Sequence, residues 1–300
     1  MITSNCAALE NRSISIFLVM ILMTGSIFLH AQQRHSIDAN QVVRRMVDNE
    51  LESGRKNQDR WMYRLQRLEG DKSTVKEIVE TTNCQIDFLL SVNGETLTSN
   101  QRQQENNRLE KLVNDPEEQQ KKKRAQEEDD RKAVEMFKML PEAFSYRYSS
   151  SRGALIELAF TPNPSFRPPT REAQVFHAME GTLLVDTREN RLVELDGRLA
   201  QDVEFLGGLF GHLEKGGHFI VKRGEIAPGQ WAITHLTVEI KGKALIFKSI
   251  NFQQIDSMSD FRPLPADVSP AEAADLLKKP ATTEVAGELA LDEGTIRSGH

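Results

Sequence analysis

This chain of 300 residues has few cysteines and few aromatic residues, and it has no excess of positive charge. Two cysteines, Cys6 and Cys84, are too few for a disulfide framework or a cysteine-rich zinc module. The chain has 38 Lys and Arg against 44 Asp and Glu, whereas a protein that binds nucleic acid usually carries a basic patch or stripe. The composition therefore argues against a nucleic-acid partner.

Recognisable catalytic motifs are lacking as well. The sequence has no Gly-x-Ser-x-Gly elbow, and its glycines do not have the spacing of a phosphate-binding loop. His212, Glu214 and His218 are residue types that bind zinc, but they lie in a glycine-rich stretch without helical ligand spacing. We read this stretch as a plain connecting loop. We expect no enzymatic activity, cofactor or metal, with a hydrolase as the minor alternative.

The N-terminus carries the longest apolar stretch. Residues 13–31, SISIFLVMILMTGSIFLHA, follow Arg12 and precede a polar segment. A basic start, an apolar centre and a small residue before polar residues are typical of an export signal. We predict cleavage after Ala31 and a periplasmic or secreted protein. The alternative is an uncleaved anchor, because the stretch approaches the roughly 20 residues that a membrane-spanning helix needs.

The next part of the chain changes its periodicity several times. Residues 36–54 have apolar side chains at helical spacing and predict an amphipathic helix. Alternating segments around Trp61 and at 74–81 and a continuous apolar run at 86–92 are separated by turn residues, which predicts an antiparallel meander. Residues 98–139 then mix acidic and basic side chains densely, and we predict two solvated helices there.

From Phe144 onward the period of two returns and indicates further strands, about ten in all. The last two, at 231–240 and 243–252, are separated only by Lys241-Gly242, which predicts a two-residue hairpin turn. Both faces of this hairpin carry apolar residues, so we expect both faces to be covered. The predicted fold class is α+β: a curved antiparallel sheet, a half-open barrel, with an N-terminal helix and inserted charged helices. A β-sandwich is the alternative.

These patterns divide the chain into three parts. Residues 1–31 form the signal peptide, and residues 32–262 form one curved-sheet domain that contains the charged helical insert at 98–139. Residues 263–300 form a C-terminal tail with a short capped helix near 269–279, otherwise disordered.

This order of elements resembles the periplasmic lipoprotein-carrier (LolA-like) superfamily. The segments MEGTLLVD at 179–186 and RLVEL at 191–195 are similar to hairpins of that family, and WAIT at 231–234 and KALIF at 243–247 to its later strands. The resemblance implies a half-open barrel whose concave face holds acyl chains beneath helical lids. It transfers no functional residue by motif match.

We therefore expect a non-enzymatic carrier or sensor of lipid, acyl chains or lipoprotein. An envelope structural or protein-interaction module is the alternative, with other envelope proteins as partners. Aromatic side chains are few, so the strand faces that carry them are the expected ligand wall. The predicted ligand-binding residues are Trp61, Tyr63, Leu183, Val185, Trp231, Ile233 and Phe247. Alternatively, both tryptophans are core residues sealed beneath helices.

One connection is unusually apolar for a loop. It contains Phe205, Leu206, Leu209 and Phe210, and we expect transient membrane contact there.

Overall fold

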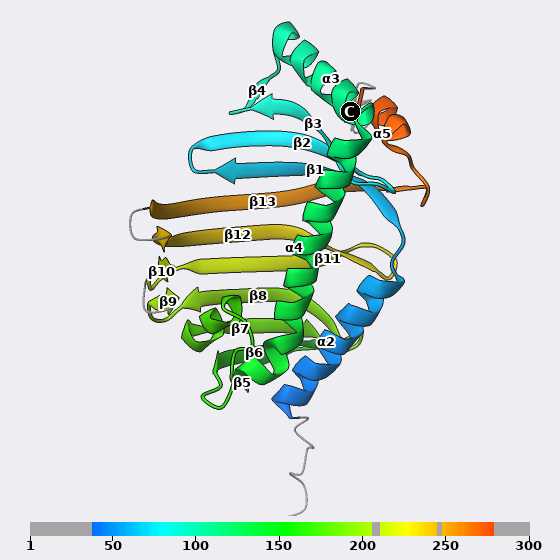
Figure 1. Ribbon diagram of the computed structural model, residues 1–300. Helices are drawn as coiled ribbons and strands as arrows, with labels where there is room; N and C mark the ends of the chain where they lie inside the picture. Colours follow the sequence, from blue (N-terminus) through cyan, green and yellow to red (C-terminus); the bar gives the residue numbers. More distant parts are fainter. Residues whose placement is uncertain (1–37, 206–210, 245–247, 279–300) are drawn as a thin grey trace, which may run out of the picture.

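The computed structural model describes residues 38–205, 211–244 and 248–278. Within this part of the chain the fold is α+β, with one curved, unclosed antiparallel sheet of 13 strands and a few helices (Figure 1). This confirms the predicted fold class, and one continuous sheet excludes a sandwich. The expected signal segment and the cleavage position at Ala31 lie outside the described residues. No described helix is both long and apolar enough to cross a membrane.

The elements follow the predicted order. The first part contains α2 (Ala39–Lys56), β1 (Arg60–Glu69), β2 (Lys72–Glu80), β3 (Gln85–Val92), β4 (Glu95–Thr96), α3 (Ser99–Val113) and α4 (Pro116–Ala143). The second part contains β5 (Phe144–Arg152), β6 (Leu155–Pro162), the 3-10 helix η1 (Glu172–Ala178), β7 (Met179–Asp186), β8 (Arg191–Leu199), β9 (Val203–Phe205), β10 (Gly211–Leu213), β11 (His218–Ala227), β12 (Gln230–Ala244), β13 (Lys248–Leu264) and α5 (Pro270–Lys278).

Helix boundaries follow local capping chemistry. The Asp38 side chain accepts a hydrogen bond from the Asn40 amide at the start of α2, and Thr98 and Gln101 form a reciprocal capping box on α3. Helix α4 begins with Pro116, which needs no amide partner at that position. The expected helices at 36–54 and 98–139 are therefore present.

The sheet joins two sequence-distant groups of strands. Its order is β4-β3-β2-β1-β13-β12-β11-β8-β7-β6-β5, with β9 and β10 attached beside β12. The expected meander forms one end of the sheet, and the later strands form the other. Strand β1 pairs with β13, so the first and last long strands meet in the middle.

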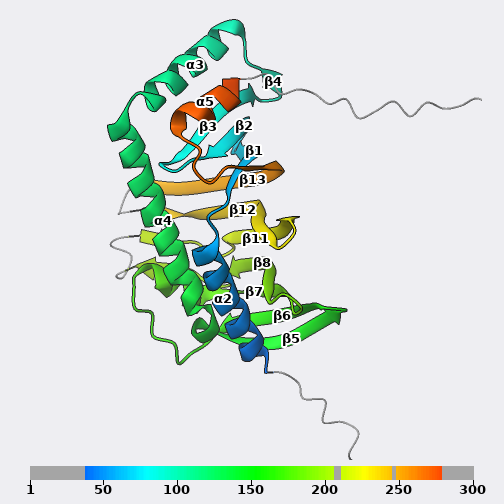
Figure 2. The ribbon, with the colours of Figure 1, turned by 90° about the vertical axis from the view of Figure 1, so that its right-hand side faces the viewer.

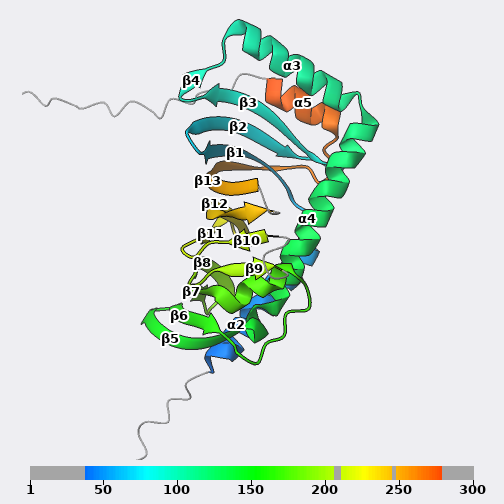
Figure 3. The ribbon, with the colours of Figure 1, turned by 60° about the vertical axis from the view of Figure 1, so that its left-hand side comes forward.

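Helix α4 crosses the strands on the concave face of the sheet (Figures 2 and 3). Its Lys122 contacts Asp87 on β3, and its Leu140 is buried in a core with β5–β8 and α2. Between these two ends the helix borders cavities over β8, β11 and β12. A helix that contacts both ends of a curved sheet and leaves space over the middle lies on the concave side.

A second core covers the opposite face near the meander. Met62, Val79 and Ile86 are paired across β1, β2 and β3 and pack with α3 and α5. Their neighbours Tyr63, Ile78 and Asp87 point to the α4 side, because side chains alternate along strands. Helix α5 thus belongs to the meander core, and the expected domain end at residue 262 falls inside β13.

The predicted turn at Lys241-Gly242 is wrong. Both residues are paired within β12, which continues to Ala244. Gly242 is required instead by the approach of β10, since a Cβ there would lie 2.1 Å from the His212 carbonyl oxygen.

The two-faced interpretation of this hairpin is also wrong. On β12, Ile233 pairs with Arg223 and His235 pairs with Lys222, so a β-bulge adds one residue between them. The bulge places Trp231 and Ile233 on the same concave face as Leu236.

A candidate ligand-binding groove beneath helix α4

Two adjoining cavities separate helix α4 from the concave face of the sheet. The larger has a volume of about 710 Å³ and is bordered by the end of α2, the middle of α4, and β8, β11 and β12. The smaller, about 320 Å³, lies between α4, η1 and strands β5–β8 and β11. Ala133, Phe137 and Leu195 line both cavities, so the two meet there. We call the two cavities together the groove.

The smaller cavity is an apolar, aromatic-rich compartment. The Phe144 ring centroid lies 4.7 Å from that of Phe160 and 5.3 Å from that of Phe176. Tyr146 is the one polar side chain among the described residues that line it. Its hydroxyl donates to the Leu140 carbonyl oxygen at 2.7 Å, and burial raises its pKa, so this group stays neutral. The described side chains that line this compartment therefore present no unpaired polar group to an apolar ligand.

The larger cavity has a charged wall next to α2. The Glu50 carboxylate, 8% exposed, accepts hydrogen bonds from Arg191 Nη1 at 3.0 Å, from the Leu192 amide at 2.9 Å and from Arg223 Nη1. Arg223 also donates through Nη2 to the Trp231 carbonyl oxygen at 3.1 Å. We call Glu50, Arg191 and Arg223 the charged triad. It fixes the end of α2 to β8 and β11 and forms part of the cavity wall.

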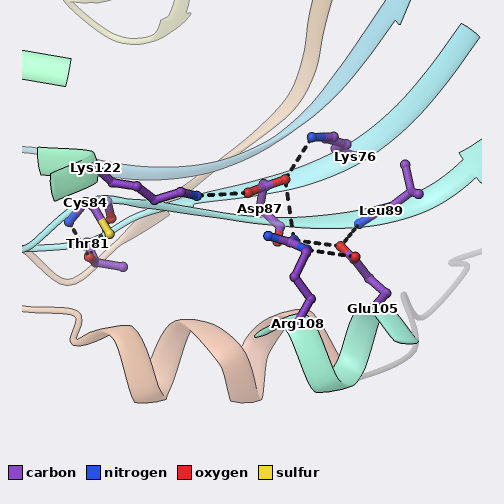
Figure 4. Close-up of polar contacts among 8 residues, drawn as sticks. All are labelled: Lys76, Thr81, Cys84, Asp87, Leu89, Glu105, Arg108 and Lys122. Carbon is purple, nitrogen blue, oxygen red and sulfur yellow. Dashed lines mark hydrogen bonds and ion pairs between the residues drawn. The ribbon is translucent and has the colours of Figure 1, made fainter. Parts of the chain in front are cut away.

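The far end of α4 is held by an ionic hub on β3 (Figure 4). Asp87 receives Lys76 from β2 at 2.9 Å, Arg108 from α3 at 3.5 Å and Lys122 from α4 at 3.6 Å. Burial of Asp87 by itself raises its pKa. The hydrogen bond from Lys76 and the charges of Arg108 and Lys122 outweigh burial, so the pKa is lowered. The carboxylate is therefore ionised at neutral pH and links α3 and α4 to the meander.

The thiol of Cys84 lies near this hub. The residue is buried, and burial raises the pKa of its thiol, with smaller opposing contributions from Lys122 and Lys123. Its backbone carbonyl accepts a 2.6 Å hydrogen bond from the Thr81 hydroxyl. A neutral buried thiol has a packing role here.

The predicted ligand-binding residues fall into four groups. Leu183, Trp231 and Ile233 line the groove. Val185 lies within the closed core beneath it, 1% exposed. Phe247 lies outside the described residues.

The two predicted residues of β1 lie on the concave face but away from the groove. Trp61 is 7% exposed and packs edge-on against Phe261, on which Tyr63 stacks with ring centroids 5.3 Å apart. Trp231 instead donates through Nε1 to Glu189 at 3.0 Å. The two tryptophans therefore do not share one wall.

Several residues that line the groove are not among the predicted ligand-binding residues. Glu50 lies one turn after Met46 and Val47 on the buried side of α2. A carboxylate on the apolar face of an amphipathic helix is the sequence signal that indicates a buried ion pair. Phe137 and Phe219 were visible as aromatic residues. Their convergence depends on where α4 crosses the sheet, which their local sequence does not encode.

The histidine-containing stretch brings no metal ligands together. Among the described residues, no group of three His, Cys, Asp or Glu side chains is arranged to hold a metal ion. His218 contacts Asp196 at 2.8 Å, and His212 lies 3.8 Å from Asp202. Phe205 ends β9, while Leu206, Leu209 and Phe210 lie outside the described residues.

Comparisons of the chain with protein-family models, curated proteins and solved structures give no match. The groove is therefore the feature of the molecule that bears on its function.

Proposed function

We propose that the protein is an exported, non-enzymatic carrier or sensor of apolar ligands, namely lipid, acyl chains or lipoprotein. The smaller cavity is the observation that carries this proposal, because it is walled by apolar side chains and opens toward the larger one. The proposal agrees with what the resemblance to the lipoprotein-carrier superfamily implies. It includes export by residues 1–31 and transient membrane contact near Phe205, Leu206, Leu209 and Phe210.

The size and chemistry of the groove favour a chain-like apolar ligand. Ligand sites typically have volumes of about 300–1,000 Å³ and mostly apolar walls, and both cavities fall within this range. Each buried methylene of a ligand contributes about 0.8 kcal/mol through removal of apolar surface from water. At the outer part of the concave face, Ile233 and Phe252 are 43% and 38% exposed, so apolar surface extends beyond the enclosed part.

The charged outer surface of α4 supports the second candidate, an envelope protein-interaction module. Glu128 pairs with Lys132 at 2.7 Å and Arg131 with Glu135 at 3.1 Å, and these side chains are largely exposed. Such a surface suits docking to a protein and requires no ligand in the groove. The two functions therefore differ in whether an apolar chain enters beneath α4.

Fluorescence of Trp231 distinguishes these functions. The chain has two tryptophans, so Trp61→Phe leaves Trp231, which lines the groove, as the single reporter. We expect oleyl alcohol or oleate, added as monomers, to shift or quench its emission saturably. Ala133→Phe should weaken this response at least tenfold, because the new ring fills the junction of the two cavities.

Ala125→Phe is the matched control. Ala125 lies exposed on the same helix and does not border the groove, so the response should persist. If neither oleyl alcohol nor oleate changes Trp231 emission in a folded protein, the carrier proposal fails and the interaction module becomes the better proposal.

A further inference from the structure

The charged triad leaves one positive charge in the wall of the larger cavity. Two guanidinium groups face one carboxylate, and the Arg191 and Arg223 side chains are only 12% and 20% exposed. A largely buried charge is costly unless an opposite charge accompanies it. The other charged residues that border this cavity, Lys56 and Asp59, are exposed at its rim, where solvent and salt screen them.

The two arginines of the triad also have N–H donors that form no hydrogen bond with the described residues. Within the described residues, Arg191 and Arg223 form three side-chain hydrogen bonds, two to Glu50 and one to the Trp231 carbonyl oxygen. Two guanidinium groups carry more N–H donors than these bonds use. In particular, Arg223 Nε is buried and has no partner among the described residues. That atom is inaccessible from the groove, but a carboxylate in the groove would balance the charge and accept hydrogen bonds from the remaining Nη donors of the two arginines, since guanidinium binds carboxylate with paired hydrogen bonds.

The groove is polar at one end and apolar at the other. The charged triad lies beside α2, Phe137 and Leu195 mark the junction, and the aromatic compartment follows. We propose that the groove binds a long-chain fatty acid, with its carboxylate at Arg191 and Arg223 and its alkyl chain extending past Phe137 into the smaller cavity. This inference rests on the proposed carrier function and narrows the ligand to a single-chain carboxylate.

Two ligands that differ only in their head group test the inference. Oleate and oleyl alcohol are titrated separately into the Trp61→Phe protein at alkaline pH, and Kd is read from Trp231 emission. We expect oleate to bind at least tenfold more tightly, the size expected of one charge-assisted hydrogen bond. Arg223→Gln should remove most of this preference, because the affinity for oleate should fall by more than the affinity for oleyl alcohol.

Glu50→Gln should change the preference in the opposite direction. It keeps an acceptor for the Leu192 amide and raises the formal charge of the triad by one unit, so oleate should bind more tightly still. Arg45→Gln, on an exposed position of α2 away from the groove, is the control for a general change of charge.

The possible outcomes separate the two proposals. Equal affinity for oleate and oleyl alcohol, or Kd changes that affect both ligands alike in the Arg223 and Glu50 variants, would overturn the fatty-acid inference while leaving the carrier function standing. Absence of binding by both ligands would instead remove the carrier proposal itself. If Arg223→Gln does not fold, the head-group preference and the Glu50→Gln result still decide.

Discussion

Single glycines determine how closely the strands beneath the groove can pack. Gly181 on β7 pairs with Gly197 on β8, and Gly197 pairs with Phe219 on β11. A Cβ on Gly181 would lie 1.9 Å from the Asp196 carbonyl oxygen, and a Cβ on Gly197 would lie 2.4 Å from the Phe219 ring. Gly197 therefore leaves room for Phe219, which lines the smaller cavity, and Gly181 allows the close approach of the β8 backbone.

We expect Gly181→Ala to destabilise the protein by about 1–3 kcal/mol, because backbone must shift to accept the methyl group. Gly54→Ala is the matched control. Gly54 lies in α2 with open space around its Cβ position, so alanine should stabilise the protein by up to about 1 kcal/mol through helix propensity. Urea unfolding at neutral pH measures both free energies. A loss of stability below about 0.5 kcal/mol for Gly181→Ala would contradict the close packing.

At the scale of elements, the Asp87 hub determines how firmly the N-terminal part of α4 is held. The pKa of Asp87 is lowered by Lys76, Arg108 and Lys122, although burial opposes them. A carboxylate with a lowered pKa stabilises the folded state above its unfolded pKa, about 3.9. This contribution is lost as the pH falls through the lower, folded value.

Asp87→Asn should therefore cost about 1.5–3 kcal/mol at pH 7, the range for hydrogen bonds to charged groups. The difference from wild type should shrink as the pH falls below about 4, since wild type then loses the same charge. Urea unfolding across this pH range measures the difference, and hydrogen exchange of α4 shows whether the loss is local. A difference that is constant with pH would show that the Asp87 charge is not responsible.

The sequence predicted elements better than the contacts between them. Helical periodicity predicted α2, and the dense mixture of charges predicted α3 and α4, because these signals are local. The turn at Lys241-Gly242 was misplaced because the partner that requires Gly242, strand β10, lies almost 30 residues earlier in a stretch read as a loop. The bulge after Ile233 is likewise invisible in a strict period of two, although it determines which residues face the groove.

The groove itself was only partly predictable. Leu183, Trp231 and Ile233 were selected because apolar and aromatic residues alternate along their strands, and all three line it. Trp61 satisfied the same criterion, yet β13 lies between its strand and that of Trp231, and the packing of Phe261 on Trp61 depends on that pairing. Pairing across such sequence distances is not encoded in either strand alone.

At the scale of the whole molecule, the first and last described helices each pack on strands from the other part of the chain. Helix α2, from the N-terminal part, packs on strands β5–β8, while α5, from the C-terminal part, packs on β2 and β3. Helix α4 connects the two ends of the sheet, and β1 pairs with β13 between them. Because each half of the sheet is covered by a helix from the other half of the chain, we expect the molecule to unfold as one cooperative unit.

The β1–β13 pairing contains an ion pair with a buried carboxylate, and this pair tests the cooperativity. Arg67 donates from Nε and Nη2 to Asp256, both at 2.7 Å, and the Asp256 side chain is 2% exposed. Asp256→Asn should destabilise the protein by about 1.5–3 kcal/mol, because a bidentate charged hydrogen bond is weakened in a buried place. Asp260→Asn removes the exposed Arg64 pair on the same two strands and should cost less than about 1 kcal/mol.

The two tryptophans report separately on the two sides of this pairing. Trp61→Phe leaves Trp231 on β12, and Trp231→Phe leaves Trp61 on β1, so each variant follows one half of the sheet in urea. In both backgrounds Asp256→Asn should lower the unfolding midpoint by the same amount, since each half depends on a helix supplied by the other. If the Trp61 midpoint falls while the Trp231 midpoint stays fixed, the meander unfolds independently, and the exchange of terminal helices does not make the molecule a single cooperative unit.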